Sequence, residues 1–375
     1  MLKYLTAGES HGKALVAILE GMPAGLRIEA SYINKELKRR QAGFGRGARM
    51  LIETDCVEII SGLRRNMTLA SPIALLIRNK DQSIEKLHSV LCPRPGHADL
   101  AGINKYGFDD IRDVLERASA RSTAATVAIG AVCKIFLEEF KIKLSSRAVC
   151  IGGESSKGQM VERISEAIRD KDTVGGIFEV IAVGVPAGLG SYAQSDRRLN
   201  GRLGGAVMSI PGIKAVEIGL GFGYADKFGS QVHDAIYTFA AKKLALQGKD
   251  EQWPLKYSAS GKSGELHYSA GGYSRRTNNA GGIEGGVSNG EEIILRACMK
   301  PISTLIKPLD SVNIKTKKSA KAAVERSDTC VVQAAGVVAE SVCAHVLADA
   351  MLEKFGQDCL ADIKTAYKNY LKRIR

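Results

Sequence analysis

The sequence is poor in aromatic residues and in long apolar runs. Aromatic residues make up 6% of the 375 residues, and tryptophan occurs once, at Trp253. The longest apolar runs, such as residues 73–77, have the length of a strand and end in Arg78, so the sequence predicts no membrane-spanning helix and no membrane partner. Glycines interrupt the N-terminal apolar segment, so we expect no signal peptide. The composition indicates a globular, cytoplasmic protein.

The eight cysteines include no Cys-x-x-Cys pair, and no zinc signature occurs. Several lie in apolar helical patterns, such as those around Cys133 and Cys343. We interpret the cysteines as free core thiols of a protein in a reducing compartment, and we expect no metal site.

The chain has fewer acidic than basic residues, which gives a formal net charge of +13. The basic clusters contain almost no aromatic residues, which disfavours nucleic acid as a partner. Small polyanions fit better, since guanidinium groups on a glycine-rich loop can converge on phosphate or carboxylate. Residues 35–49 form such a segment, although Lys35 and Lys38 are equally typical of a solvated helix face. Its arginines are Arg39, Arg40, Arg46 and Arg49.

Two compact polar groups contain the most reactive side chains. The first is Gly8-Glu9-Ser10-His11-Gly12, and the second is Arg94-Pro95-Gly96-His97-Ala98-Asp99. A histidine titrates near neutral pH and can transfer a proton where glycines bring the backbone close to a ligand. A polar turn after a first strand is the alternative interpretation of the first group.

The first group also matches the Gly-x-Ser-x-Gly pattern of a nucleophile elbow, so a serine hydrolase using Ser10 is an alternative function. Only seven residues precede Gly8, whereas several strands precede the serine in that fold. Residues 219–223 also lack the following helix that a dinucleotide-binding fingerprint requires.

The apolar pattern predicts a single α+β domain over residues 1–375. Strands are expected at 14–20, 50–61 and 71–78, and Ser31 is expected to cap a helix over 34–41. Long helices rich in small residues are predicted over 110–140 and 330–355, packed between antiparallel sheets. The motifs Glu116-Arg117-Ala118-Ser119 and Glu325-Arg326-Ser327-Asp328 precede them, which suggests an internal duplication. Residues 239–272 are polar and are expected to form a surface excursion.

Nearly the whole chain resembles chorismate synthase, of the short monofunctional bacterial type. The resemblance rests on motifs in order along the chain: Leu5-Thr6-Ala7-Gly8-Glu9-Ser10-His11-Gly12, Gly45-Arg46-Gly47, Arg94-Pro95-Gly96-His97-Ala98-Asp99, Glu116-Arg117-Ala118-Ser119-Ala120-Arg121, Asn278-Asn279-Ala280-Gly281-Gly282, Lys300-Pro301-Ile302-Ser303-Thr304-Leu305 and Glu325-Arg326-Ser327-Asp328.

The resemblance implies a lyase that converts 5-enolpyruvylshikimate 3-phosphate to chorismate and phosphate by an anti 1,4-elimination. It implies reduced FMN as cofactor, an association with NADP and a homotetramer. His11 would protonate the departing phosphate, His97 would neutralise charge on the reduced flavin, and Asp328, supported by Ser10 and Ser119, would relay a proton. The substrate-binding residues would be Arg39, Arg46, Arg49 and Arg94. The flavin-binding residues would be Arg117, Ala118, Ser119, Pro211, Gly212, Gly285, Lys300, Pro301, Ile302, Ser303, Thr304 and Arg326.

Several positions depart from the family pattern. Ser122 and Thr126 replace a charged pair four residues apart, and Pro211-Gly212 replaces Asn-Ala beside the expected flavin. Cys92 and Gln333 replace Arg and Pro. A proline removes an amide and its hydrogen bond, so we expect an active enzyme with altered FMN affinity.

Overall fold

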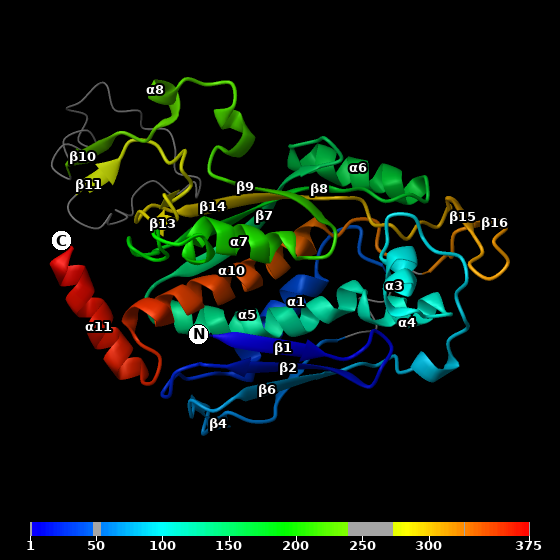
Figure 1. Cartoon of the computed structure of the whole chain (residues 1–375), viewed down its shortest axis with the longest axis horizontal. Helices are drawn as coiled ribbons and strands as arrows, with labels where there is room; N and C mark the ends of the chain where they lie inside the picture. Colours follow the sequence, from blue (N-terminus) through cyan, green and yellow to red (C-terminus); the bar gives the residue numbers. More distant parts are fainter. Residues whose placement is uncertain (1, 48–53, 239–272, 326, 375) are drawn as a thin grey trace.

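The fold is a sandwich of two antiparallel sheets with helices between them (Figure 1). It is a computed structural model, which describes residues 2–47, 54–238, 273–325 and 327–374. The predicted excursion at 239–272 lies outside these residues. One continuous apolar core extends through both sheets and the helices that they enclose, which confirms the α+β class.

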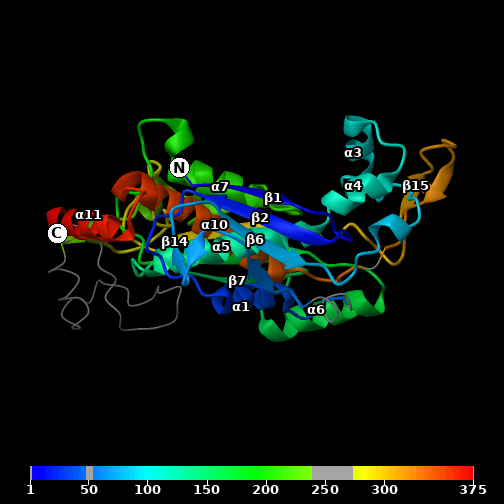
Figure 2. The ribbon, with the colours of Figure 1, turned by 90° about the horizontal axis from the view of Figure 1, so that it is seen from below.

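The first sheet has four strands in the order β1 (Lys3–Ala7), β2 (Ala14–Glu20), β6 (Ile73–Arg78) and β3 (Val57–Ile59). Side chains of this sheet point alternately to the core and to the outer face. In β2, Leu15, Ala17 and Leu19 are buried, while Ile18 is 41% exposed. In the view of Figure 2, strands β1, β2 and β6 lie in front of the helices, so their outer face is turned to the viewer.

The second sheet has the order β7 (Lys143–Ile151), β8 (Gly176–Val183), β14 (Ile293–Met299) and β9 (Ile213–Ile218). Its outer face has a row of alternating charges. Arg147 pairs with Glu179 at 2.7 Å, Glu179 with Arg296 at 2.9 Å, and Arg296 with Glu217 at 3.3 Å.

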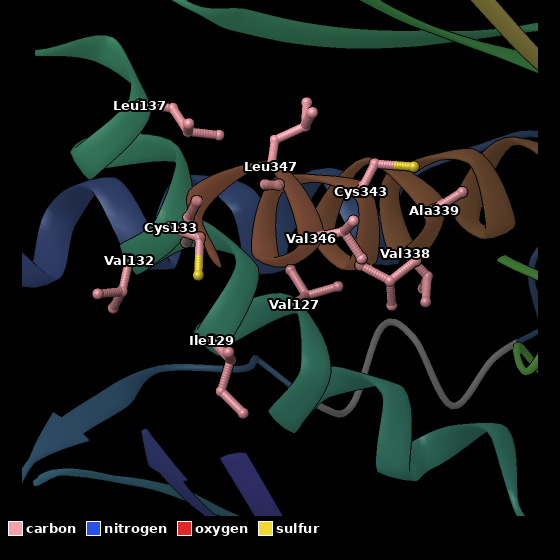
Figure 3. Packing of buried hydrophobic residues seen from close by; sticks show 14 of the residues in the cluster. Val127, Ile129, Val132, Cys133, Leu137, Val338, Ala339, Cys343, Val346 and Leu347 are labelled. Carbon is pink, nitrogen blue, oxygen red and sulfur yellow. The ribbon is translucent and has the colours of Figure 1, made fainter. Parts of the chain in front are cut away.

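Helices α5 (Thr123–Glu138) and α10 (Val332–Phe355) pack side by side between the sheets (Figure 3). Small residues permit the close approach, because a Cβ at Gly130 would lie 2.2 Å from the Cβ of Ser341. The two helices run in the same direction (Figure 1). Their C-terminal ends meet at Tyr367, whose ring contacts both Phe140 and Phe355.

The two halves of the chain repeat one topology. In the first half, β1, β2, α1 (Ala30–Gln41), β3, a two-strand hairpin and β6 precede α5. In the second half, β7, β8, α7 (Leu199–Met208), β9, a two-strand hairpin and β14 precede α10. Equivalent strands occupy equivalent places in the two sheets. Glu116 and Glu325 each stand seven residues before the first residue of their helix. The expected internal duplication is therefore present in the topology.

The remaining elements extend this frame. A small lobe contains α3 (Asp99–Tyr106), α4 (Ile111–Arg117) and the pair β15 (Asp310–Val312) and β16 (Ser319–Lys321), with its own apolar cluster. The hairpins are β4 (Leu63–Arg64) with β5 (Met67–Thr68) and β12 (Ile283–Glu284) with β13 (Val287–Ser288). The others are α6 (Lys157–Arg169), α8 (Gly229–Val232), β10 (Ile236–Thr238), β11 (Tyr273–Arg275), α11 (Leu360–Arg373) and the short 3-10 turns Ile84–Lys86, Ala120–Ser122, Ser195–Arg197 and Gly221–Tyr224.

Some predicted boundaries were wrong. Helix α1 begins at Ala30 after Glu29, so Ser31 lies inside the helix and not at its cap. The strand expected over 50–61 is formed at Val57–Ile59 among the described residues. The helix expected over 110–140 is broken, because Ser119 has an extended backbone between α4 and the turn that leads into α5.

Two helical stretches of the described residues, Ile111–Glu138 and Val332–Phe355, are apolar and long enough to cross a membrane, and both lie mostly in the protein core. In their most apolar windows, 78% and 94% of the residues are buried in the protein. All eight cysteines are free, as expected, but only Cys133, Cys330 and Cys343 are buried, and Cys56 is exposed.

Candidate active site

The turn between β1 and β2 presents Ser10 and His11. Gly8 has a φ of +105°, and a Cβ there would lie 2.2 Å from the carbonyl oxygen of Ala14, so only glycine fits this position. Asn79, which follows β6, donates its side-chain amide to the carbonyl of Gly12 at 2.8 Å. The turn is thus in close contact with the start of β2 and is hydrogen-bonded by the residue that follows β6.

Glu116 fixes His11 at two points. The Glu116 carboxylate lies 2.9 Å from Nδ1 of the imidazole and accepts the His11 amide at 2.8 Å. Burial alone would raise the pKa of Glu116, but these hydrogen bonds from His11 hold the pKa below its usual value. The carboxylate therefore stays ionised beside the ring.

Ser10 donates its hydroxyl to Ser119 at 3.2 Å. The hydroxyl of Ser119 also accepts the amide of Arg121 at 3.2 Å. The contact between Nδ1 of His11 and Glu116 is also found in a hydrolase triad, where a carboxylate orients the base. The hydroxyl of Ser10 differs, because it donates to Ser119, whereas in a hydrolase it donates to the imidazole. The serine hydrolase alternative is not favoured by this geometry.

His97 forms a second histidine–carboxylate pair, with Asp99. Its Nδ1 lies 2.5 Å from Oδ1 of Asp99, and Asp99 is fully buried. Arg94 donates to both oxygens of this carboxylate and to the hydroxyl of Thr304 at 2.7 Å. Burial opposes ionisation, yet the hydrogen bonds from His97 and Arg94 hold the pKa of Asp99 far below its usual value. The donors of Arg94 are thereby committed to the protein.

The 300–304 run lies against the same group. Lys300 and Ser303 both donate to the carbonyl of Gly96, the latter at 2.8 Å. The amide of Lys300 donates to Gly212 at 3.0 Å, which places the Pro211-Gly212 turn beside this run. Burial and repulsion from Lys214 lower the pKa of Lys300. A pocket of about 570 Å³ lies next to His97, between the start of α3 and β15, within the usual size range of ligand sites.

An arginine cluster lies behind the Ser10 turn. The buried carboxylate of Asp55 accepts from Arg40 at 2.9 Å and from Arg121 at 2.5 Å. Arg40 is wholly buried, and this desolvation lowers its pKa, with repulsion from Arg121 and Arg46 acting in the same direction. The Nε of Arg40 has no hydrogen-bond partner among the described residues.

Asp328 joins this cluster from the start of α10. It pairs with Arg46 at 3.1 Å and accepts the amide of Gly47 at 2.5 Å. A Cβ on Gly47 would come within 3.0 Å of the carbonyl oxygen of Ser327, so the glycine permits the loop to approach Asp328 closely.

Comparisons with known proteins show the family of the chain. The model of the family described as chorismate synthase matches residues 2–352. The chain is 50% identical over its full length to a chorismate synthase of Caldanaerobacter subterraneus subsp. tengcongensis and 49% identical to one of Thermoanaerobacter pseudethanolicus, and it covers 99% of each. A solved structure titled "Crystal Structure of Chorismate Synthase" matches with a TM-score of 0.76 and 39% identity, over 100% of this chain and 98% of that one.

The chain belongs to the chorismate synthase family. Chorismate synthase is a carbon–oxygen lyase of the shikimate pathway, and the family generally uses a flavin. In this member, two groups of the expected residues come together. The first contains Ser10, His11, Ser119, Arg46 and Asp328, and the second contains Arg94, His97, Pro211, Gly212 and residues 300–304.

Other expected chorismate synthase residues are placed differently. Arg39 gives its guanidinium to the carboxylates of Glu340 and Glu36 at 2.7 Å, whereas its neighbour Arg40 faces the arginine cluster. Arg117 donates to the carbonyls of Gly8 and Thr6 and so ties the end of α4, with Ala118 beyond it, to β1. Gly285 lies in the β12–β13 hairpin, at the opposite end of β14 from Lys300. Arg49 and Arg326 lie outside the described residues.

Six residues of the site were not predicted as functional from the chorismate synthase motifs. They are Arg40, Asp55, Asn79, Asp99, Glu116 and Arg121. Glu116 and Arg121 lie within a recognised motif. Their burial next to charged partners marks them as site residues, and the sequence alone does not show it. The cluster fits an anionic ligand, because the buried guanidinium of Arg40, whose Nε has no hydrogen-bond partner among the described residues, suits a phosphate or carboxylate oxygen.

Proposed function

We propose that the protein converts 5-enolpyruvylshikimate 3-phosphate to chorismate and phosphate, and that reduced FMN is required. The observation that supports this most is the pair of histidines, each held through Nδ1 by a buried carboxylate, beside buried arginines. In the anti 1,4-elimination, the ring carbon–oxygen bond breaks and its electrons leave with phosphate. A ring carbon–hydrogen bond supplies the electron pair of the new double bond and releases a proton, without net redox change.

The side chains of the site have separate tasks in this proposal. His11 protonates the departing phosphate through Nε2, because its Nδ1 is occupied by Glu116. Arg46 and the neighbouring Arg40 and Arg121 balance the negative charge of substrate and cofactor. Asp328, which pairs with Arg46 at 3.1 Å, would relay a proton with the support of Ser10 and Ser119.

The second group would hold the flavin. Lys300, Ser303 and the turn at Gly212 lie together beside His97, which would balance negative charge on the cofactor. Bound reduced FMN would supply the electron density that removal of an unactivated ring hydrogen needs, since no protein side chain is basic enough. Arg39 and Gly285 stay predicted ligands, although within the single chain neither lies in the group around His11 or in the group around His97.

We also propose a homotetramer in the cytoplasm. It is supported by the outer face of the first sheet and its rim, where Leu5 is 74%, Ile60 61% and Leu69 52% exposed. Apolar side chains gathered on one face of a protein are typical of a subunit interface. Sedimentation equilibrium would give a mass four times that of the chain, and a monomeric mass would contradict the proposal.

The function is tested by anaerobic turnover of 5-enolpyruvylshikimate 3-phosphate with dithionite-reduced FMN. We expect chorismate and phosphate in equal amounts, and no product when flavin is omitted or oxidised. Full activity without flavin would refute the cofactor assignment. Labelling of Ser10 by a fluorophosphonate, together with absence of chorismate, would instead support the serine hydrolase.

A further inference from the structure

Glu116 combines three contacts to the Ser10-His11 turn in one residue. Its backbone carbonyl accepts the amide of Ser10 at 2.8 Å, one carboxylate oxygen accepts the amide of His11 at 2.8 Å, and the other lies 2.9 Å from Nδ1 of the His11 ring. Its side chain is 5% exposed. A single buried residue thus sets both the backbone and the imidazole of His11.

We propose that Glu116 is the positioning residue for His11, which fixes the protonated nitrogen of the ring and aims Nε2 at the departing phosphate. This proposal rests on the function proposed above for His11. Glu116 itself touches neither substrate nor cofactor in this role. It acts only through the orientation and charge of the imidazole.

The chemistry of the carboxylate determines which nitrogen carries the proton. An ionised carboxylate accepts hydrogen bonds and donates none, so Nδ1 must be the donor to Glu116. The second proton of an imidazolium then resides on Nε2, on the far side of the ring. Transfer of that proton to a phosphate oxygen forms the oxygen–hydrogen bond as the nitrogen–hydrogen bond breaks, and leaves a neutral ring still held by Glu116.

The two histidine–carboxylate pairs differ in how much of the carboxylate is available. Asp99 is shared between His97 and three donors of Arg94, its backbone amide and two guanidinium nitrogens. Among the described residues, both oxygens of Glu116 accept hydrogen bonds from His11 alone. Arg112 is the other charged group that acts on Glu116, at longer range, and it pairs with Glu325. The charge of Glu116 is therefore directed at one imidazole.

The repeat provides a matched control for Glu116. Glu325 occupies the same offset before α10 that Glu116 occupies before α5. It pairs with Arg112 at 2.8 Å and, among the described residues, has no histidine partner. Glu325→Gln therefore removes a carboxylate from the equivalent site of the other half, without altering a hydrogen bond to His11.

The experiment compares Glu116→Gln, Glu116→Asp and Glu325→Gln with the wild type. In Glu116→Gln, the amide oxygen must accept the His11 backbone amide, so its NH₂ group faces Nδ1 and can no longer stabilise an imidazolium. We expect kcat to fall about 100-fold, within the usual contribution of a general acid, with KM nearly unchanged. The alkaline limb of the kcat profile should move to lower pH. Glu116→Asp should recover part of kcat, and Glu325→Gln should keep both kcat and its pH profile.

Two further measurements separate positioning from stability and from the proposed reaction. In ¹⁵N spectra of the histidine side chains, which need no substrate, the His11 ring should carry its proton on Nδ1 in the wild type and in Glu325→Gln, and lose this preference in Glu116→Gln. A preference that survives in Glu116→Gln would overturn the proposal even if the lyase function holds. In the background of His11→Ala, Glu116→Gln should lower turnover no further, and a full additional 100-fold loss would also overturn it.

Discussion

Thr68 and Ser288 make the same hydrogen bonds in the two halves of the chain. The hydroxyl of Thr68 donates to the carbonyl of Pro23 at 2.5 Å and accepts the amide of Leu26 at 2.8 Å. The hydroxyl of Ser288 makes the equivalent bonds to the turn at 186–189, at 2.6 and 2.8 Å. Both turns have the sequence Pro-Ala-Gly-Leu, so the repeat extends to single hydrogen bonds.

Thr68→Ala should destabilise the protein, because the substitution leaves the carbonyl of Pro23 and the amide of Leu26 buried without their partner. We expect a loss of about 1–3 kcal/mol in the free energy of unfolding, measured by urea denaturation. Thr68→Ser, which places in the first half the residue found in the second, should retain most of the stability. Equal losses in both variants would mean that the methyl group, not the hydroxyl, is important.

Gly130→Ala tests the close contact between α5 and α10. The new Cβ would lie 2.4 Å from the Cα of Ser341, so the helices must separate, at a cost of about 1–3 kcal/mol or more. Gly204→Ala in α7 is the matched control, since among the described residues no heavy atom beyond the adjoining backbone of its own helix and its chain neighbours lies within 4 Å of that Cβ. The substitution should stabilise the helix by about 0.5–1 kcal/mol. Thermal unfolding of both variants gives the comparison.

Lys134 lies in a buried ion cluster with Glu36 and Glu340, at 2.5 Å from each. Burial opposes the charge of Glu340, but its bonds to Arg39 and Lys134 hold its pKa below the ordinary 4.5. A depressed carboxyl pKa stabilises the fold above pH 4.5, and this contribution is lost as pH falls through the lower, folded-state value.

Lys134→Met should therefore lower stability by about 3–5 kcal/mol at neutral pH, because Arg39 is then the one cation paired with the two buried carboxylates among the described residues. Unfolding measured from pH 7 to pH 3 should also show a weaker pH dependence in the variant than in the wild type. An unchanged acid slope would show that Lys134 does not depress the pKa of Glu340.

His11→Ala and His97→Ala should each lower turnover by roughly two to four orders of magnitude, the usual contribution of a general acid or base. Flavin affinity should survive in the His11 variant, since His11 lies in the first group and not with Lys300. Steady-state turnover and titration with reduced FMN in the presence of substrate measure the two effects. Wild-type turnover in both variants would assign these histidines to structure only.

The class of fold was predictable because alternation and small-residue helices depend on local sequence. The sequence alone predicts one buried face of β2, with Leu15, Ala17 and Leu19, and a buried helix at the alanines of α5. The order of strands in each sheet was not, because antiparallel pairing joins segments far apart, such as β2 with β6. The start of α1 was misjudged since the buried Ile33 and Leu37 set its register rather than the capping preference of Ser31.

The site was predictable in its motifs but not in its pairing. His11 and Glu116 are 105 residues apart, and only folding shows that they form one unit. The structure shows what Gly212 does at the Pro211-Gly212 departure from the family pattern. Gly212 has a φ of +87°, and its carbonyl accepts the amide of Lys300. Gly212→Ala would strain this turn, so an effect of the departure on FMN affinity is best measured with Pro211→Asn alone.

The parallel arrangement of α5 and α10 has an electrostatic consequence. Each helix bears roughly half a positive elementary charge at its N-terminus from aligned peptide dipoles. Ser119 and Asp328 each stand four residues before these two ends, so the dipoles add where anions are proposed to bind, whereas antiparallel helices would cancel them. This potential comes from the backbone. It therefore persists at every pH and cannot be removed by replacing a single arginine.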